Sequence, residues 1–414
     1  MKKVLIFAAF AAAVLVAGCA KNEVFKKATK ETPVTFGVYN GRMATKAVSA
    51  TDFGPFNEAT SLQGATNGFG VFAYYTGDTP YASSTAANFM YNEQVRYSAG
   101  EWYYSPVKYW PNEHGAGATS PIVDEGDPTE HYTADKLTFL CYAPYVASVG
   151  TEGITSMTGN TATEDAKLGF TVPTSTAQQI DLMYGVLGSV STNVESGTDG
   201  VLNGPIKDLT KQECDGVVNI LFKHALAKAQ IDIRTIVDDV LANAPTDKDP
   251  GDDGTVVVVS SLNIKGSGIG TSGILNLYTG TWSGTAGTAS FAVDPLPASI
   301  AVASAPTAQP AIAGVLEAGL TTNKLNLMFV PAGTITGVEI IYYVCTEDDK
   351  LGFNGGASII ENHITKNFDS PITVTAGKQY NINISLGLTS IKLTASVDEW
   401  DDDDINIELP ANVA

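Results

Sequence analysis

Apolar and polar residues alternate with a period of two along much of this chain, and that pattern restricts what it can fold into. The clearest run is Tyr380 to Leu388, where five apolar residues alternate with polar or small ones. Successive side chains of a β-strand point to opposite faces of a sheet, so this run predicts a half-buried strand. Helical patterns with a period of 3.6 are scarce, and we predict an all-β fold. Further strands are expected at Gly70–Tyr75, Leu137–Tyr142, Val217–Phe222, Thr255–Lys265, Ile274–Tyr278, Lys324–Val330, Val338–Val344 and Ile391–Val397.

The length of 414 residues predicts two domains, because one domain usually holds about 100–200 residues. Ala242–Gly254 is rich in Asp, Asn, Pro and Gly and lacks an apolar period, so it is the expected linker. The predicted domains are residues 47–246 and 247–414, each long enough for one β-sandwich. The Ala- and Pro-rich stretch Pro295–Pro310 is the alternative boundary or a long surface loop. Residues 218–233 are expected to form one bent strand.

The first residues have the pattern of a bacterial lipoprotein signal. A basic start precedes the apolar run Val4–Ala17, and Leu15 opens a short series of small residues that ends at Cys19. A membrane-spanning helix needs roughly 20 apolar residues, so this run is too short to span. We predict removal of residues 1–18 and lipid attachment at Cys19, with residues 19–46 as a lipidated propeptide. An ordinary secretion signal followed by a chance cysteine is the alternative.

Charge is distributed asymmetrically along the chain. The net charge is −20, but residues 1–46 contribute +6, which leaves −26 on residues 47–414. A surface that binds nucleic acid needs clustered Lys and Arg, and the acidic body has no such cluster, so no nucleic-acid partner is expected. Acidic clusters at Asp247–Asp253 and Asp398–Asp404 lack the spacing of an EF-hand. They are solvated turns or adventitious calcium ligands.

Motifs for catalysis or cofactor binding are weak. Gly268–Gly273 matches the GxGxxG string of nucleotide-binding folds, but Ile274–Tyr278 after it is expected to be the second arm of a hairpin rather than a helix. The four histidines have no zinc-site spacing, and the chain has no GxSxG elbow. His224 is expected to be a hydrogen-bonded structural residue. The three later cysteines stand in apolar contexts typical of buried residues, with a disulfide between two of them as the alternative. We predict no catalytic residue, metal or cofactor.

One short alternating run lies near each end of the chain. The apolar residues of these runs are Val34, Phe36 and Val38 in the basic leader and Ile405, Ile407 and Leu409 after an acidic stretch at the other end. A lone strand is unstable in water, so each must add to a sheet edge or groove in its own subunit or another. A trypsin-like cut after Arg42 or Lys46 would release the first strand and open a groove for a neighbour's last strand. Such strand addition is head-to-tail and propagates into filaments.

Aromatic residues are dense between Tyr97 and Trp110. Tyr and Trp are ordinary strand residues that anchor a core, and they also stack on sugar rings. Structural packing and a carbohydrate-binding platform are the two interpretations of this segment.

Several motifs occur in one order along nearly the whole chain. They are Leu15–Cys19, Ala44-Thr-Lys46-Ala, Phe69–Tyr74, Trp102–Pro111, Leu137–Pro144, Asp181–Met183, Asn219–Ala227, Gly377–Ile384 and Val397–Trp400. In this order the chain resembles the fimbrillin family of Bacteroidales, the type V pilins. The resemblance implies two transthyretin-like Greek-key β-sandwich domains in tandem, a secreted lipoprotein precursor, loss of the early strand to an Arg- or Lys-specific protease, and donor-strand exchange. Lys46 matches the family's Thr-Arg/Lys-Ala pattern, whereas the family's cut usually follows arginine and Arg42 is the nearest one.

The combined interpretation is a structural pilin, a shaft subunit of adhesive surface fimbriae without enzymatic activity. The lipoprotein precursor is expected at the cell outer membrane, held there only by its lipid, and the processed subunit in the extracellular fimbrium. Expected partners are copies of itself, tip and anchor subunits, the processing protease and a host or bacterial surface ligand. The alternative is a fimbrial tip or lipid-anchored carbohydrate-binding adhesin, and a surface glycan hydrolase ranks third.

Salt should promote assembly of the processed subunit, residues 47–414. Subunits this acidic repel one another, and salt at 0.1 M screens charges beyond about 10 Å, while buried apolar strand faces are unaffected by screening. Light scattering of processed subunits at increasing sodium chloride concentration measures the effect. A fall in assembly with rising salt would show that charge attraction drives association instead.

Overall fold

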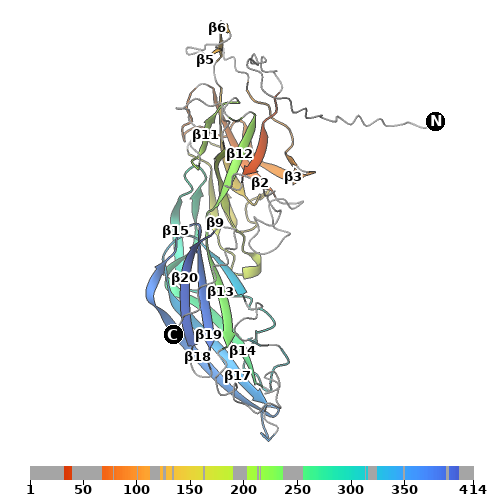
Figure 1. Cartoon of the computed structure of the whole chain (residues 1–414), viewed down its shortest axis with the longest axis vertical. Helices are drawn as coiled ribbons and strands as arrows, with labels where there is room; N and C mark the ends of the chain where they lie inside the picture. Colours follow the sequence, from red (N-terminus) through yellow and green to blue (C-terminus); the bar gives the residue numbers. More distant parts are fainter. Residues whose placement is uncertain are drawn as a thin grey trace, which may run out of the picture.

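The computed structural model describes residues 32–39, 68–77, 79–99, 101–111, 122–124, 127–132, 135–161, 164–189, 203–211, 214, 216–235, 255–312, 314–315, 324–347, 350–387 and 391–400. Within these ranges the regular structure is β-strand, apart from one short 3₁₀ turn, η2 (Thr176–Gln178). The all-β prediction is therefore confirmed. Figure 1 shows the strands in an upper and a lower group along the long axis. No helix in the described ranges has the length and apolar composition needed to cross a membrane.

The upper group is built on one sheet with the order β1-β12-β10-β7-β2-β3-β4, and β11 also pairs with β7. The bounds are β1 Thr35–Tyr39, β2 Phe69–Gly77, β3 Met90–Ser98, β4 Glu101–Tyr103, β7 Lys136–Ala143, β10 Met183–Ser189, β11 Ile206–Leu209 and β12 Val217–His224. β1 runs parallel to β12, whereas the other pairs of this sheet are antiparallel. A separate small hairpin joins β5 (Ile122–Asp124) to β6 (Asp127–Tyr132).

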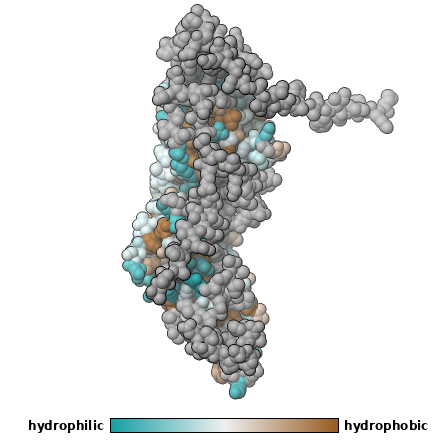
Figure 2. Space-filling view, viewed as in Figure 1, coloured by the Kyte–Doolittle hydropathy of each residue, from teal (hydrophilic) through white to brown (hydrophobic). Residues whose placement is uncertain are grey.

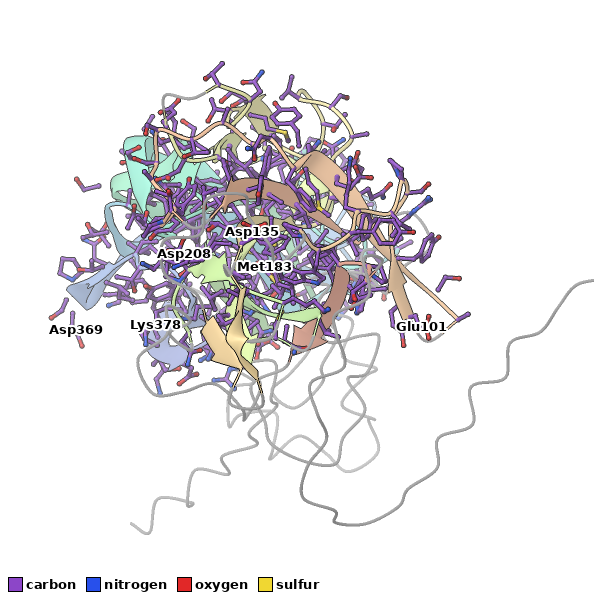
Figure 3. All side chains as sticks on the ribbon, turned by 90° about the horizontal axis from the view of Figure 1, so that it is seen from above. Glu101, Asp135, Met183, Asp208, Asp369 and Lys378 are labelled. Atoms are coloured by element: carbon purple, nitrogen blue, oxygen red, sulfur yellow. The ribbon has the colours of Figure 1, made fainter. Side chains whose placement is uncertain are left out.

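The lower group consists of two sheets. One has the order β16-β13-β19-β20, and the other has the order β18-β17-β14-β9-β8 with β15 also paired to β14. The bounds are β8 Ile154–Met157, β9 Lys167–Thr171, β13 Ala227–Thr235, β14 Thr255–Asn276, β15 Trp282–Ala292, β16 Lys324–Phe329, β17 Thr334–Glu347, β18 Ala357–Thr373, β19 Lys378–Leu386 and β20 Ile391–Glu399. Seen along the long axis, Glu101 of β4 and Asp369 of β18 lie at opposite sides of the molecule (Figure 3).

The clearest alternating run of the sequence became strand β19 as predicted. Tyr380, Ile382 and Ile384 are buried, while Asn381 and Asn383 between them are half-exposed. The strand lies between β13 and β20, so the alternation follows from one face meeting the core and the other meeting solvent.

The Gly268–Gly273 string lies within strand β14, not before a helix. The expected hairpin break before Ile274 was wrong, because the chain continues as a single strand of 22 residues to Asn276. The hairpin partner is β15, which pairs with β14 from Asn263 to Leu275. The glycine and serine residues in the middle of β14 form a sequence that is typical of a turn. The segment stays extended because β15 pairs with it on one side and supplies backbone hydrogen bonds.

The segment from Val218 to Ile233 was expected to be one bent strand, and it forms two strands in two sheets. β12 belongs to the upper sheet and β13 to the lower sheet, with only Ala225 and Leu226 between them. Both linking residues are fully buried. The alternation persists through the crossing because each half has one buried face, which hides the change of sheet from the sequence pattern.

The hydrophobic core is continuous between the two groups of strands. One buried cluster contains Phe72 and Tyr142 of the upper sheet together with Ile382 and Trp400 of the lower group. A second cluster lies on the other face of the upper sheet and includes Phe36. The shared cluster ties the upper and lower strands into one packed body.

The predicted boundary after residue 246 lies in residues 236–254, outside the described ranges. Two strands that precede this predicted boundary in the sequence pair with strands that follow it in the lower sheets. β9 pairs with β14, and β13 pairs with β16 and β19.

Replacing Gly70 by alanine should destabilise the upper sheet. A Cβ at this position would lie 2.2 Å from the ring of Tyr142, which is fully buried and has no room to move. Overpacking of this kind costs about 1–3 kcal/mol in the free energy of unfolding. The matched control is Gly352→Ala, because nothing lies within 4 Å of a Cβ there. Thermal unfolding of both variants tests the difference, and equal midpoints would contradict it.

Candidate strand-binding groove

Strand β1 is inserted between two parts of the chain that follow it by many residues. On one side it pairs in parallel with β12, from Thr35 opposite Val217 to Tyr39 opposite Leu221. Just before the strand, the Val34 amide donates to the Lys108 carbonyl at 2.9 Å, and the Trp110 amide donates to the Thr32 carbonyl at 2.9 Å. Residues 32–39 therefore bond to residues 108–110 through their first three residues and to β12 through β1.

The apolar residues of β1, and Val34 just before it, point into the core. Val34 is fully buried and Phe36 is 5% exposed, whereas Val38 is partly buried against the same cluster. Phe36 makes edge contacts with Phe69, Tyr104 and Phe139, with ring centroids 5.6–5.8 Å apart. Aromatic pairs in this arrangement add about 0.5–1.5 kcal/mol each beyond the area they bury. Phe36 is thus the central anchor of the strand.

Tyr104 and Trp110 hold the far wall of the groove in place. The Tyr104 hydroxyl lies 3.0 Å from the Val34 carbonyl and 3.2 Å from the Lys108 carbonyl, and it accepts a hydrogen bond from the Lys108 amide. Burial raises the pKa of Tyr104 to about 12, so it stays protonated and keeps its hydrogen to donate. The Trp110 indole donates to the Gly216 carbonyl at 3.1 Å, which links this wall to the start of β12.

The groove recognises a strand through backbone groups and apolar pockets. Its floor consists of aromatic and aliphatic side chains of the second cluster, including Phe69, Phe139, Val218 and Ile220. Gly37 faces the opposite side, where a Cβ would lie 2.5 Å from the Asn219 amide oxygen. The site therefore favours a strand with apolar residues at alternate positions and a small residue between them.

The aromatic segment from Tyr97 to Trp110 divides between packing and exposure. Trp102 packs on Phe69 and on Tyr97, and Tyr104 and Trp110 belong to the groove. Tyr103 and Tyr109 are 43% and 50% exposed. The high density of aromatic residues indicated that this segment packs or binds. Their spacing in the sequence did not indicate that Tyr104 would contact Val34 and Phe36.

Several residues predicted to be functional lie outside the described residues. They are Cys19, Arg42, Lys46, Ile405, Ile407 and Leu409. Among the described residues, no group of three or more His, Cys, Asp and Glu side chains is placed to hold a metal ion. The prediction for His224 is confirmed, because its Nδ1 lies 2.7 Å from Asp181 Oδ2.

Comparison with known proteins identifies the family. The profile of the family described as Fimbrillin-like matches residues 57–400. The chain belongs to this family. The matched residues include the groove walls but neither β1 nor residues 401–414.

The chain is also similar to individual known proteins. The fimbrium subunit Fim1C of Phocaeicola vulgatus is 29% identical over 226 residues, which are 52% of this chain and 48% of the relative. The chain thus matches about half the length of that curated protein. A crystal structure of a fimbrial protein from Bacteroides vulgatus is 21% identical, with a TM-score of 0.57 over 89% of this chain and 99% of that chain. A putative cell adhesion protein from Bacteroides uniformis, 14% identical, aligns over 89% of this chain and 100% of that one with a TM-score of 0.44.

Truncating Phe36 should loosen β1 in its groove. Phe36→Ala removes the anchor ring, and comparable core truncations lower the free energy of unfolding by about 3–5 kcal/mol. Phe353→Ala is the matched control, because Phe353 is 62% exposed and surface changes of this kind stay within about 0.5 kcal/mol. Denaturant titration of the uncleaved chain measures both. If the two variants lose the same stability, β1 does not depend on the groove for its binding.

Proposed function

We propose that this chain is a structural shaft subunit of fimbriae that is exported as a lipoprotein and polymerised by donor-strand exchange. In this proposal a protease cuts after Arg42 or Lys46, β1 leaves, and the terminal segment with Ile405, Ile407 and Leu409 of a neighbour takes its place. Membership of a fimbrillin-like family supports a role as a fimbrial subunit that assembles with other fimbrial subunits at the cell surface. The precursor would be held at the outer membrane by lipid on Cys19.

The observation that carries this proposal is the insertion of β1. β1 pairs with β12, residues 32–34 just before it bond to residues 108–110, and the buried Val34 and Phe36 are part of the core. Residues 40–68 connect β1 to β2, and both candidate cut sites, Arg42 and Lys46, stand in that connection. One cut there separates an integral strand from the body covalently and leaves every later strand on the body.

An empty groove would be costly, and this supports strand exchange rather than simple loss. Removal of β1 exposes apolar side chains of the floor, and each fully buried side chain of this type contributes about 1.5–3 kcal/mol. The backbone groups of β12 that face β1 would also lose their partners, which costs about 1–3 kcal/mol for each group not reached by water. A replacement strand with alternating apolar residues restores both contributions.

The alternative is a fimbrial tip or lipid-anchored adhesin that binds carbohydrate. The exposed rings of Tyr103 and Tyr109 favour it, and the guanidinium of Arg96 lies 5.5 Å from the centre of the Tyr103 ring. A tip subunit would accept a strand but would not need to donate one. An adhesin that keeps its lipid would retain the leader with β1 in place.

Two measurements test the proposed function. Amino-terminal sequencing of surface-purified protein should begin at Met43 or Ala47, whereas a blocked, lipidated Cys19 supports the anchored adhesin. Deletion of residues 401–414 should abolish filaments seen by electron microscopy, because no donor strand is left, while the monomer should unfold at the same temperature as the parent. Filaments formed by the truncated chain would rule out the donor-strand assignment.

A further inference from the structure

Strand β20 carries an apolar face that the rest of the subunit leaves uncovered. In its antiparallel pairing with β19, Leu393, Ala395 and Val397 stand opposite Ile384, Ile382 and Tyr380. Opposite residues of an antiparallel pair share one face of the sheet. The three β19 residues are at most 1% exposed, yet Val397 is 49% exposed, Ala395 is exposed and Leu393 is only half-buried. The inner face of the sheet therefore continues past the area that the opposite sheet covers.

The neighbouring strand β18 also has exposed apolar residues on the inner face of its sheet. It is the edge strand of its sheet and lies close to β20. Ile360 and Ile364 stand opposite Val344 and Ile340 of the buried face of β17. Ile360 is nevertheless 52% exposed and Ile364 is half-buried.

A polar group between these residues also lacks a partner. Asn362 stands opposite the buried Tyr342, and its side-chain nitrogen is buried without a hydrogen bond. We call this surface the seam, and it consists of Ile360, Asn362, Ile364, Leu393, Ala395 and Val397. Figure 2 shows hydrophobic surface at the height of β20 in the same view as Figure 1.

The terminal segment leaves the body beside the seam, at the junction of the upper and lower strands. β20 runs antiparallel to β19 and ends at Glu399. The ring of the next residue, Trp400, stacks on His224 at the end of β12 with centroids 3.8 Å apart and 4° between the planes. The Trp400 amide donates to the Gly377 carbonyl at 3.0 Å, and the Gly377 amide donates to the Leu226 carbonyl at 2.9 Å. Trp400 is 7% exposed. These contacts fix the starting point of residues 401–414 near the middle of the long axis, where Figure 1 places the end of β20.

The length of chain after Trp400 then limits where a neighbour can be. Ile405 is five residues away, and five extended residues span about 17 Å. β20 alone, with nine residues, covers about 30 Å between the junction and the far end of the lower group. Ile405 therefore cannot pass the far end of the lower group. A neighbour's groove that takes Ile405 must therefore come within about 17 Å of Trp400, and Val397 of the seam stands only three residues before Trp400.

We propose that the seam is the surface of the donor subunit on which the upper sheet of the next copy docks. This inference rests on the proposed function, because it takes residues 401–414 as the donor strand. The apolar seam faces the apolar groove region of the second copy, and the two contacts are made by one neighbour. The contact between consecutive subunits is consequently head-to-tail, with the seam acting only on the donor side.

Two engineered subunits test the seam, one that can only donate a strand and one that can only accept a strand. The donor is residues 20–414 with Arg42→Gln and Lys46→Gln, so it keeps β1 and cannot accept a strand. The acceptor has lost β1 by cleavage and ends at Trp400, a deletion that removes no described strand. Sedimentation velocity measures the dissociation constant of the single dimer that such a pair can form.

Val397→Asp in the donor should weaken the dimer by at least about tenfold, because it buries a carboxylate against the neighbour's apolar surface. Ser396→Asp in the donor is the matched control, because Ser396 is exposed on the opposite face of β20 and should change the constant by no more than about twofold. Val397→Asp in the acceptor should have no effect.

Each other outcome overturns a definite part of the inference. Equal constants for the two donor variants, or an equal loss when Val397→Asp is in the acceptor, overturn the seam and leave strand exchange standing. Tighter dimerisation by the Val397→Asp donor also overturns it, because the seam would then hold the donor's own terminal segment before assembly. No dimer from the unmodified pair overturns the proposed function and the seam with it.

Discussion

The fold depends on how residues 32–39 fill the groove of the upper sheet. Residues 32–34 bond to residues 108–110, β1 pairs with β12, and the ring of Phe36 packs into the core between them. The Trp110 indole also bonds to Gly216 at the start of β12. β1 is part of the core but is joined to β2 through one connecting segment, which is the physical basis of the proposed exchange.

A second constraint connects this groove with the other end of the chain. β12 lines the groove, continues into β13 through two buried residues, and ends at His224, where Trp400 stacks. The imidazole of His224 is hydrogen-bonded to the Asp181 carboxylate, and the Lys228 amine lies 5.5 Å from the centre of the Trp400 ring. β12 and the start of the terminal segment are therefore packed on each other. The shared hydrophobic cluster packs the upper strands on the lower strands.

The sequence predicted some strands correctly and others wrongly. The alternation at Tyr380–Leu386 predicted β19 because one face of that strand is buried while the other is half-exposed as far as Asn383. The same reasoning missed the break at Ala225 and Leu226, since a strand that changes sheets keeps its period when both halves bury one face. It also misplaced the end of β14, because Gly and Ser look like a turn locally, and only pairing with β15 and β17 shows that the segment is extended.

The sequence alone determined the all-β class, the negative body with a basic leader, and the two alternating runs near the chain ends, because these depend on local periodicity and on charge. Tertiary structure decided what the runs contact. Val34 and Phe36 were recognisable as one face of a strand, but Tyr104, Trp110 and Phe139 come from separate segments that meet only after folding. The seam is likewise invisible in the sequence: Val397 alternates as a buried residue does, and only the end of the opposite sheet leaves it exposed.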